Sequence, residues 1–261
     1  MRDTLDALAA GELSVEAAHA RLRGYTTSDA GRFDAARASR TGVPEAILAE
    51  GKRSPEVGEL AALAIETTGR AIVTRAGQRD VEAVRSALAD RAGLDDGGLD
   101  VEIEHDERAR TMVAHGPDFE PASLDAVVGV VTAGTADAGP AGEAAVMIEE
   151  IGATVERIDD VGVAGLARTL DALPDLRDAD VLVVAAGREG ALPTVVAGLV
   201  DVPVIALPVS VGYGHGGAGE AALAGTLQSC TPLVTVNIDA GFVAGAHAGQ
   251  VARALDAARG E

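Results

Sequence analysis

Two side chains with reactive groups stand out in the sequence. One is the only cysteine, Cys230, and the other is Glu189, part of an Arg-Glu pair flanked by glycines. A thiolate is a strong nucleophile, and a carboxylate at a ligand-binding edge can act as a general base. A free thiol of ordinary pKa is only a few per cent ionised at neutral pH. Because Cys230 follows a predicted helix, whose C-terminal end disfavours a thiolate, a nucleophilic Cys230 requires a cation nearby. Without one, a single cysteine is more often a small buried hydrophobic residue.

A Gly/Thr turn at residues 132–137 offers backbone N–H groups to an anion. Gly134 and Thr135 lie where a strand would pass into a helix, and a helix N-terminus there would bind phosphate. Asp137 is then either the N-cap of that helix or a functional carboxylate.

Two later loops also carry polar groups. Residues 208–217 can wrap a phosphate or a ribose with backbone N–H groups, or can form a plain flexible connection. His215 in this loop is left open between a general acid, a phosphate contact and neither. Asn237 and Asp239 are expected to hold neighbouring loops together rather than to act in catalysis.

The second half of the chain alternates nearly continuous apolar runs with helical patterns. Such runs are typical of parallel strands covered on both faces, and the alternation predicts βαβ units with right-handed crossovers. We therefore expect an α/β protein whose C-terminal part is a flavodoxin-like, doubly wound parallel sheet, with ligands at the carboxyl ends of the strands. The strands are expected at 126–131, 154–158, 181–185, 204–207 and 233–236, and the helices at 138–151, 163–173, 191–199, 220–229 and 240–257.

The first half predicts a smaller N-terminal α+β domain. We expect domains at residues 1–120 and 121–261, with a proline-containing linker at 115–123. The helices are expected at 2–10, 14–23, 55–68 and 78–92, the strands at 70–74, 101–104 and 111–114, and a turn at 95–98.

Composition narrows the class of protein. The net charge of −20 argues against non-specific binding to nucleic acid or to an anionic membrane. One cysteine cannot form an intramolecular disulfide, and neither a signal-peptide core nor an apolar run of membrane-spanning length is present. We therefore expect a cytoplasmic protein. The five histidines show no metal-ligand spacing, and Lys52 is the only lysine among 21 basic residues.

Several segments, taken in order, resemble known families. The turn at 134–137 and the segments 185–198 and 203–208 are similar to those of the aminoimidazole ribonucleotide carboxylase fold. A closer resemblance, over nearly the whole chain, is to the LarB family, which begins the synthesis of the nickel-pincer nucleotide cofactor. The motifs that carry it are GVPE, EGK, AIVTR, VVTAGTAD, ERIDDVGVAG, AAGREGALPTVVAGLVDVPVIALPVSVGYG, SC and VNIDAGF.

The LarB resemblance implies a carboxylase and hydrolase of the transferase class. Such enzymes carboxylate the pyridinium ring of nicotinic acid adenine dinucleotide at C5 with carbon dioxide and cleave its phosphoanhydride, giving pyridinium-3,5-biscarboxylic acid mononucleotide and AMP. The resemblance implies Cys230 as the nucleophile, and Glu189 fits the base; the pyridinium cation would hold the thiolate ionised. Asp137 is a candidate to position water.

The resemblance also implies how the substrate is held. The groups expected to bind it are Gly134, Thr135, Gly187, Ser210, Gly212, Tyr213 and Gly214, joined from the first domain by Lys52 and Arg75. No tightly bound cofactor is expected, a divalent cation is left open for the hydrolysis, and a homo-octamer is implied.

Two other functions remain open. The purine carboxylases place Ala-Ala-His in the segment where this chain has Arg188, Glu189 and Gly190, so the nucleotide site looks retained and the catalytic groups replaced. An aminoimidazole ribonucleotide carboxylase would need neither Cys230 nor the N-terminal domain. A non-catalytic nucleotide-binding module would tolerate Cys230→Ala and Glu189→Gln.

Overall fold

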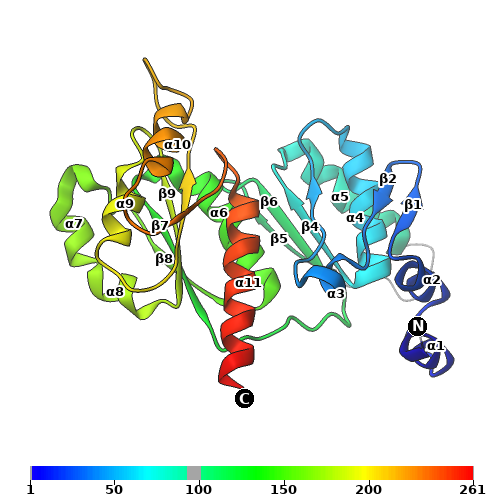
Figure 1. The fold of residues 1–261 in the computed structure, drawn as a ribbon. Helices are drawn as coiled ribbons and strands as arrows, with labels where there is room; N and C mark the ends of the chain where they lie inside the picture. Colours follow the sequence, from blue (N-terminus) through cyan, green and yellow to red (C-terminus); the bar gives the residue numbers. More distant parts are fainter. Residues whose placement is uncertain (1, 93–100, 261) are drawn as a thin grey trace. The chain divides into compact units, whose positions relative to one another are not determined.

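The computed structural model describes residues 2–92 and 101–260, and the chain divides into unit 1, Met1–Glu120, and unit 2, Pro121–Glu261 (Figure 1). The turn expected at 95–98 lies outside the described residues. Within the described ranges, no helix has both the length and the apolarity that a membrane crossing needs.

Unit 2 is built on a five-stranded parallel sheet with the strand order β11-β10-β9-β7-β8. This order is flavodoxin-like and confirms the predicted fold class. Because β8 lies on one side of β7 and β9 on the other, the order reverses between β7 and β9. The strands are β7 (Val127–Thr132), β8 (Thr154–Ile158), β9 (Val181–Ala186), β10 (Val204–Pro208) and β11 (Val234–Thr235).

Alternate side chains of these strands face two helical layers, which explains why the strands read as continuous apolar runs. Val128, Val130 and Val183 pack with α6 (Ala138–Ile151) and α11 (Gly241–Arg259). Val131 and Val184 pack on the other face, with α8 (Leu173–Asp178) and α9 (Ala191–Ala197). Figure 1 shows α6 and α11 side by side on their face of the sheet.

A glycine sets the spacing of α6 and α11. A Cβ at Gly245 of α11 would lie 2.3 Å from the carbonyl oxygen of Ala144 of α6. The two helices therefore meet backbone to backbone at this point.

The prediction of a single helix at 163–173 is wrong. The chain forms a 3-10 turn, η2 (Val163–Gly165), then α7 (Leu166–Asp171) and α8. Pro174 lies at the first turn of α8, where its missing N–H costs nothing, whereas inside a continuous helix it would remove a hydrogen bond. The remaining helix of unit 2 is α10 (Glu220–Leu227).

Unit 1 is a four-stranded mixed sheet, with the order β3-β4-β6-β5, packed against two helices. Its core gathers residues from the sheet and from both helices, among them Val57, Val73, Val84 and Met112. The elements are α1 (Arg2–Ala9), α2 (Val15–Arg23), β3 (Ile47–Leu48), α4 (Ser54–Thr68), β4 (Arg70–Thr74), α5 (Gln78–Ala92), β5 (Glu102–Asp106) and β6 (Thr111–His115).

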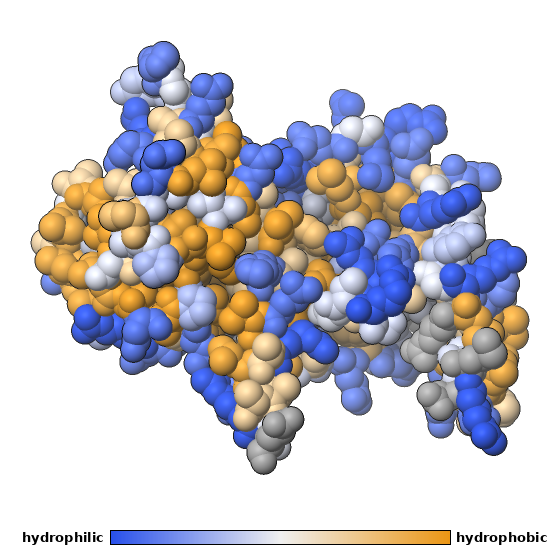
Figure 2. All heavy atoms as spheres, viewed as in Figure 1, coloured by the Kyte–Doolittle hydropathy of each residue, from blue (hydrophilic) through white to orange (hydrophobic). Residues whose placement is uncertain are grey.

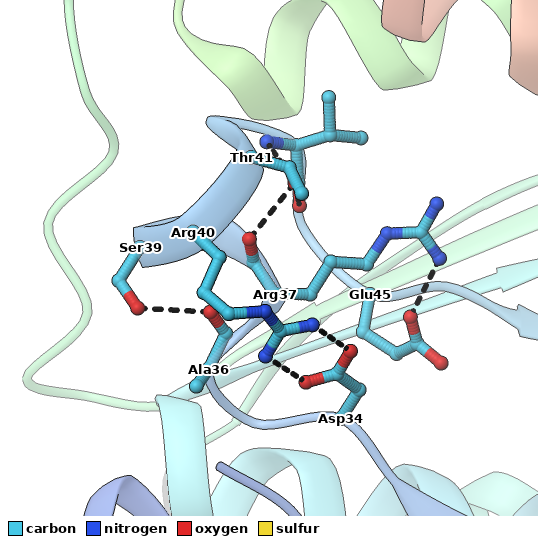
Figure 3. A network of polar contacts seen from close by, with 8 residues as sticks. Asp34, Ala36, Arg37, Ser39, Arg40, Thr41 and Glu45 are labelled. Atoms are coloured by element: carbon cyan, nitrogen blue, oxygen red, sulfur yellow. Dashed lines mark hydrogen bonds and ion pairs between the residues drawn. The ribbon is translucent and has the colours of Figure 1, made fainter.

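Sequence patterns miss the segment before α4, where β1 (Thr26–Ser28), β2 (Gly31–Phe33), α3 (Arg37–Thr41) and β3 form. Two ion pairs hold α3 in place (Figure 3). Arg40 pairs with Asp34 at 2.6 Å, and Arg37 pairs with Glu45 at 2.8 Å. Polar contacts of this kind leave no hydrophobic period in the sequence.

The linker predicted at 115–123 begins too early in the chain. The His115 ring stacks on the Phe119 ring at a centroid distance of 4.6 Å, and the Arg70 guanidinium lies 5.1 Å from the Phe119 centroid. These residues therefore pack within unit 1, and the chain leaves it after Glu120.

Candidate active site

A pocket of about 410 Å³ opens at the carboxyl ends of β7, β8 and β9, where the strand order reverses. Open α/β sheets bind their ligands at this kind of switch point. The loops after these strands supply the walls, and Val211 after β10 completes them. Five residues singled out from the sequence line it, namely Gly134, Thr135, Asp137, Gly187 and Glu189.

Asp137 is the buried carboxylate of the pocket, with 4% of its surface exposed. It ends the 3-10 turn η1 (Thr135–Asp137), and its Oδ2 accepts the backbone N–H of Gly134 at 2.8 Å. Burial raises the pKa of Asp137, partly offset by backbone hydrogen bonds from Gly134 and Gly187. The carboxylate thus connects the loop after β7 to the loop after β9.

Glu189 lies on the loop after β9, and its side chain is exposed at the pocket. Close backbone packing fixes this loop from two sides. A Cβ at Gly187 would lie 2.4 Å from the Val211 carbonyl oxygen. On the other side, a Cβ at Gly225 of α10 would lie 2.5 Å from the carbonyl oxygen of Glu189. The glutamate is therefore carried on a rigid loop, as a general base requires.

The pocket also holds two guanidinium groups to which the sequence assigned no role. Arg168 of α7 pairs with Asp160 at 2.8 Å, and the Asp160 N–H donates to Thr132 Oγ1 at 3.0 Å. Arg188, beside Glu189, lies with its guanidinium carbon 4.3 Å from the Tyr213 ring centroid. The sequence signal for Asp160 was its place directly after a predicted strand, whereas Arg168 gave none.

Cys230 is exposed and does not border this pocket. It follows α10 and precedes β11, which runs parallel to β10, so it lies toward the amino ends of the strands. Its neighbour Thr231 donates to the Thr194 carbonyl of α9 at 3.4 Å. Glu189 lies at the carboxyl ends instead, so one chain does not bring Cys230 into the pocket with Glu189.

The loop at 210–214 lies beside the pocket but borders it only through Val211. The Ser210 N–H donates to Asp239 Oδ1 at 2.9 Å, which confirms the loop-holding role expected of Asp239. The Asn237 side chain accepts the N–H of the next residue, Ile238, at 2.9 Å. Tyr213 is 80% exposed. The substrate contacts of Ser210, Gly212, Tyr213 and Gly214 stay predictions.

Lys52 and Arg75 belong to unit 1 and lie after β3 and β4, which are parallel neighbours. Lys52 Nζ donates to the Leu48 carbonyl at 2.7 Å, and Arg75 pairs with Glu50 at 2.8 Å. Both side chains thus have local structural partners, and their contact with a substrate stays a prediction. Across residues 2–92 and 101–260, no three His, Cys, Asp or Glu side chains gather as a metal site would require.

The fold and the pocket define unit 2 as a flavodoxin-like α/β unit with a ligand site at its switch point. Residues 127–259 match the AIR carboxylase family, and residues 25–116 match the LarB/PurE-like N-terminal domain. An uncharacterized protein of Methanocaldococcus jannaschii is 33% identical over 261 residues, covering 98% of each chain. The chain belongs to the LarB family, with the two-domain architecture of that family and a carboxylase-family role.

Proposed function

We propose that this protein carboxylates nicotinic acid adenine dinucleotide at C5 of its pyridinium ring and hydrolyses the phosphoanhydride. The products are pyridinium-3,5-biscarboxylic acid mononucleotide and AMP. The observation that carries the proposal is the switch-point pocket of a LarB-family chain, which holds both Glu189 and Asp137.

The carboxylation requires a nucleophile because a pyridinium ring is electron-poor and does not attack carbon dioxide. The Cys230 thiolate adds to C4 and breaks the aromaticity, which makes C5 the nucleophilic carbon of an enamine. C5 then forms a bond to carbon dioxide. Glu189 takes the C5 proton while the C4–S bond breaks, and the ring regains its aromaticity.

The hydrolysis is assigned to Asp137. A raised pKa makes a carboxylate a better acceptor for the proton of an attacking water, and burial supplies that shift here. The backbone N–H groups of Gly134 and Thr135 belong to the same turn and are proposed to hold the phosphates. Water attacks one phosphorus, and the P–O bond to the bridging oxygen breaks to release AMP.

Cys230 lies outside the pocket of its own chain, so we propose that it completes the pocket of a neighbouring copy in a homo-oligomer. The exposed thiol and two exposed apolar neighbours, Leu227 at 63% and Val234 at 50%, support this placement. Figure 2 shows hydrophobic residues gathered over a face of unit 2. Exposed apolar patches of this kind mark protein interfaces.

The test is to incubate the full chain with nicotinic acid adenine dinucleotide and ¹³C-bicarbonate and to follow the products by mass spectrometry. We expect AMP together with a mononucleotide that carries one labelled carboxyl group. Glu189→Gln should remove the labelled product. An exposed glutamate outside the pocket, changed as Glu220→Gln, serves as the control and should retain it. If neither product forms while aminoimidazole ribonucleotide is carboxylated, the chain is a purine carboxylase and the proposal is wrong.

A further inference from the structure

Among the described residues, one of the two guanidinium groups of the pocket, that of Arg188, lies outside an ion pair. Its carboxylates are Asp137, Asp160 and Glu189, and its guanidinium groups are Arg168 and Arg188. Arg168 is paired with Asp160. In the part of the chain that the structure describes, Arg188 has no carboxylate partner. An arginine that lines a pocket without a carboxylate partner keeps N–H donors available to an anionic group of a ligand.

The backbone holds Arg188 in an unusual conformation. Its φ is +54°, in the left-handed region that residues with a Cβ rarely adopt. The Arg188 N–H donates to the Val211 carbonyl at 2.9 Å, and Gly187 packs directly on that same carbonyl. The loop after β10 therefore holds the backbone of Arg188 in place. The Arg188 side chain forms part of the pocket wall.

Tyr213 supports the guanidinium from one side. The guanidinium carbon lies 4.3 Å from the ring centroid, within the range of a cation–π contact. Hydrogen bonding to Arg188, followed by the charge of Arg188, lowers the pKa of Tyr213. A guanidinium carries five N–H donors, and those that Tyr213 does not engage fit the oxygens of a phosphate.

We propose that Arg188 binds a phosphate group of the nucleotide substrate at the pocket, with Tyr213 as its positioning residue. The inference rests on the proposed function only in taking a nucleotide as the ligand. The same guanidinium edge fits a carboxylate, so the two anions must be separated by experiment. The turn at Gly134 and Thr135 forms the pocket wall with Arg188, which favours the phosphate.

The experiment is calorimetric titration of the full chain with AMP, with adenosine and with nicotinic acid. Arg188→Gln should weaken AMP binding about tenfold, as expected for the loss of a hydrogen bond to a charged group, and should leave adenosine and nicotinic acid binding unchanged. Arg188→Lys should retain part of the affinity for AMP, because lysine keeps the positive charge but lacks the paired N–H donors of the guanidinium. Arg177→Gln is the matched control, since Arg177 donates to the Leu199 carbonyl and does not border the pocket.

Tyr213 is tested through the salt dependence of AMP binding. Tyr213→Ala should weaken AMP binding and reduce its dependence on salt, whereas Tyr213→Phe should retain both because the ring remains. Equal AMP affinity in the parent and Arg188→Gln chains, or no AMP binding by the parent, overturns the proposal. A loss confined to nicotinic acid assigns a carboxylate instead and also overturns it. AMP binding can be measured without turnover. If AMP binding depends on Arg188 but the chain does not carboxylate the dinucleotide, the proposed function is wrong and the proposal for Arg188 stands.

Discussion

Asp137 and Gly134 are joined by a hydrogen bond of 2.8 Å, from the Gly134 N–H to the Asp137 carboxylate, inside the turn that opens the pocket. Asp137 as a residue is 4% exposed, so its carboxylate is largely removed from water. This desolvation raises its pKa, although the backbone bonds from Gly134 and Gly187 oppose the shift. The same carboxylate therefore shapes the turn and binds a proton more readily than an ordinary aspartate does.

Asp137→Asn should change how stability depends on pH. A folded-state pKa raised above 3.8 means that the folded chain holds this proton more tightly than the unfolded chain does. The stabilising effect is thus present below the ordinary pKa and is lost as the pH rises through the raised one. The Tm difference, Asn variant minus parent, should become more positive from about pH 4 to about pH 8.

The exposed Asp201 provides the control for that experiment. Asp201→Asn makes the same change of carboxylate to amide at an exposed position and measures what that charge change alone does to Tm. A Tm difference for Asp137→Asn that stays constant with pH would contradict the burial effect.

Cys230→Ser should abolish carboxylation, with a loss of at least about 10³-fold, because a serine alkoxide does not form at neutral pH and the covalent step fails. The measurement is labelled product formed per hour, alongside the oligomeric state. Gln228→Ala, an exposed change two residues away, should keep the parent rate. Carboxylation that survives in Cys230→Ser would remove the thiol from the mechanism.

The neighbouring-copy placement of Cys230 predicts complementation between subunits. Mixed oligomers formed from Cys230→Ser and Glu189→Gln chains should recover part of the activity, since some pockets then combine a native Glu189 with a native Cys230. Each variant alone should remain inactive. If the mixture also stays inactive after subunit exchange has been verified, the two groups do not act across copies.

Gly225→Ala should destabilise the protein by about 1–3 kcal/mol, as overpacking does. Alanine in place of glycine inside a helix usually stabilises by about 1 kcal/mol, so the expected sign is reversed. The reason is the Glu189 carbonyl, which would lie 2.5 Å from the new Cβ. Thermal unfolding measures the effect. Gly198→Ala, whose Cβ would meet nothing closer than 3.4 Å, should be close to neutral.

Asp180→Asn should destabilise unit 2 by about 1–3 kcal/mol near pH 7, because Asp180 accepts the Val127 N–H at 2.9 Å and pairs with Arg259. Hydrogen bonding to Arg259 lowers the pKa of Asp180 below 3.8. That stabilisation is present above the ordinary pKa and is lost as the pH falls through the lowered value. The Tm gap between parent and variant should therefore narrow below about pH 4. A gap of constant size would contradict the ion-pair contribution.

The sequence by itself determined the parallel sheet of unit 2, because strands buried on both faces require continuous apolar runs such as 181–185. It also located Glu189 and Asp137, since residues that follow such strands meet at one edge of the sheet. The segment 25–50 escaped prediction because ion pairs such as Arg37 with Glu45 order it. The junction of α7 and α8 at Ala172 was missed because the apolar pattern alone was read as a continuous helix.

Only the tertiary structure decided which reactive groups share the pocket. Glu189 and Asp137 come together because their strands are neighbours, whereas Cys230 precedes β11 and lies outside the lining. The sequence marked Cys230 by its chemistry, but a distance in space depends on the direction in which each strand runs. The unpaired charge of Arg188 was likewise decided by the fold, since pairing depends on neighbours that lie far apart in the chain.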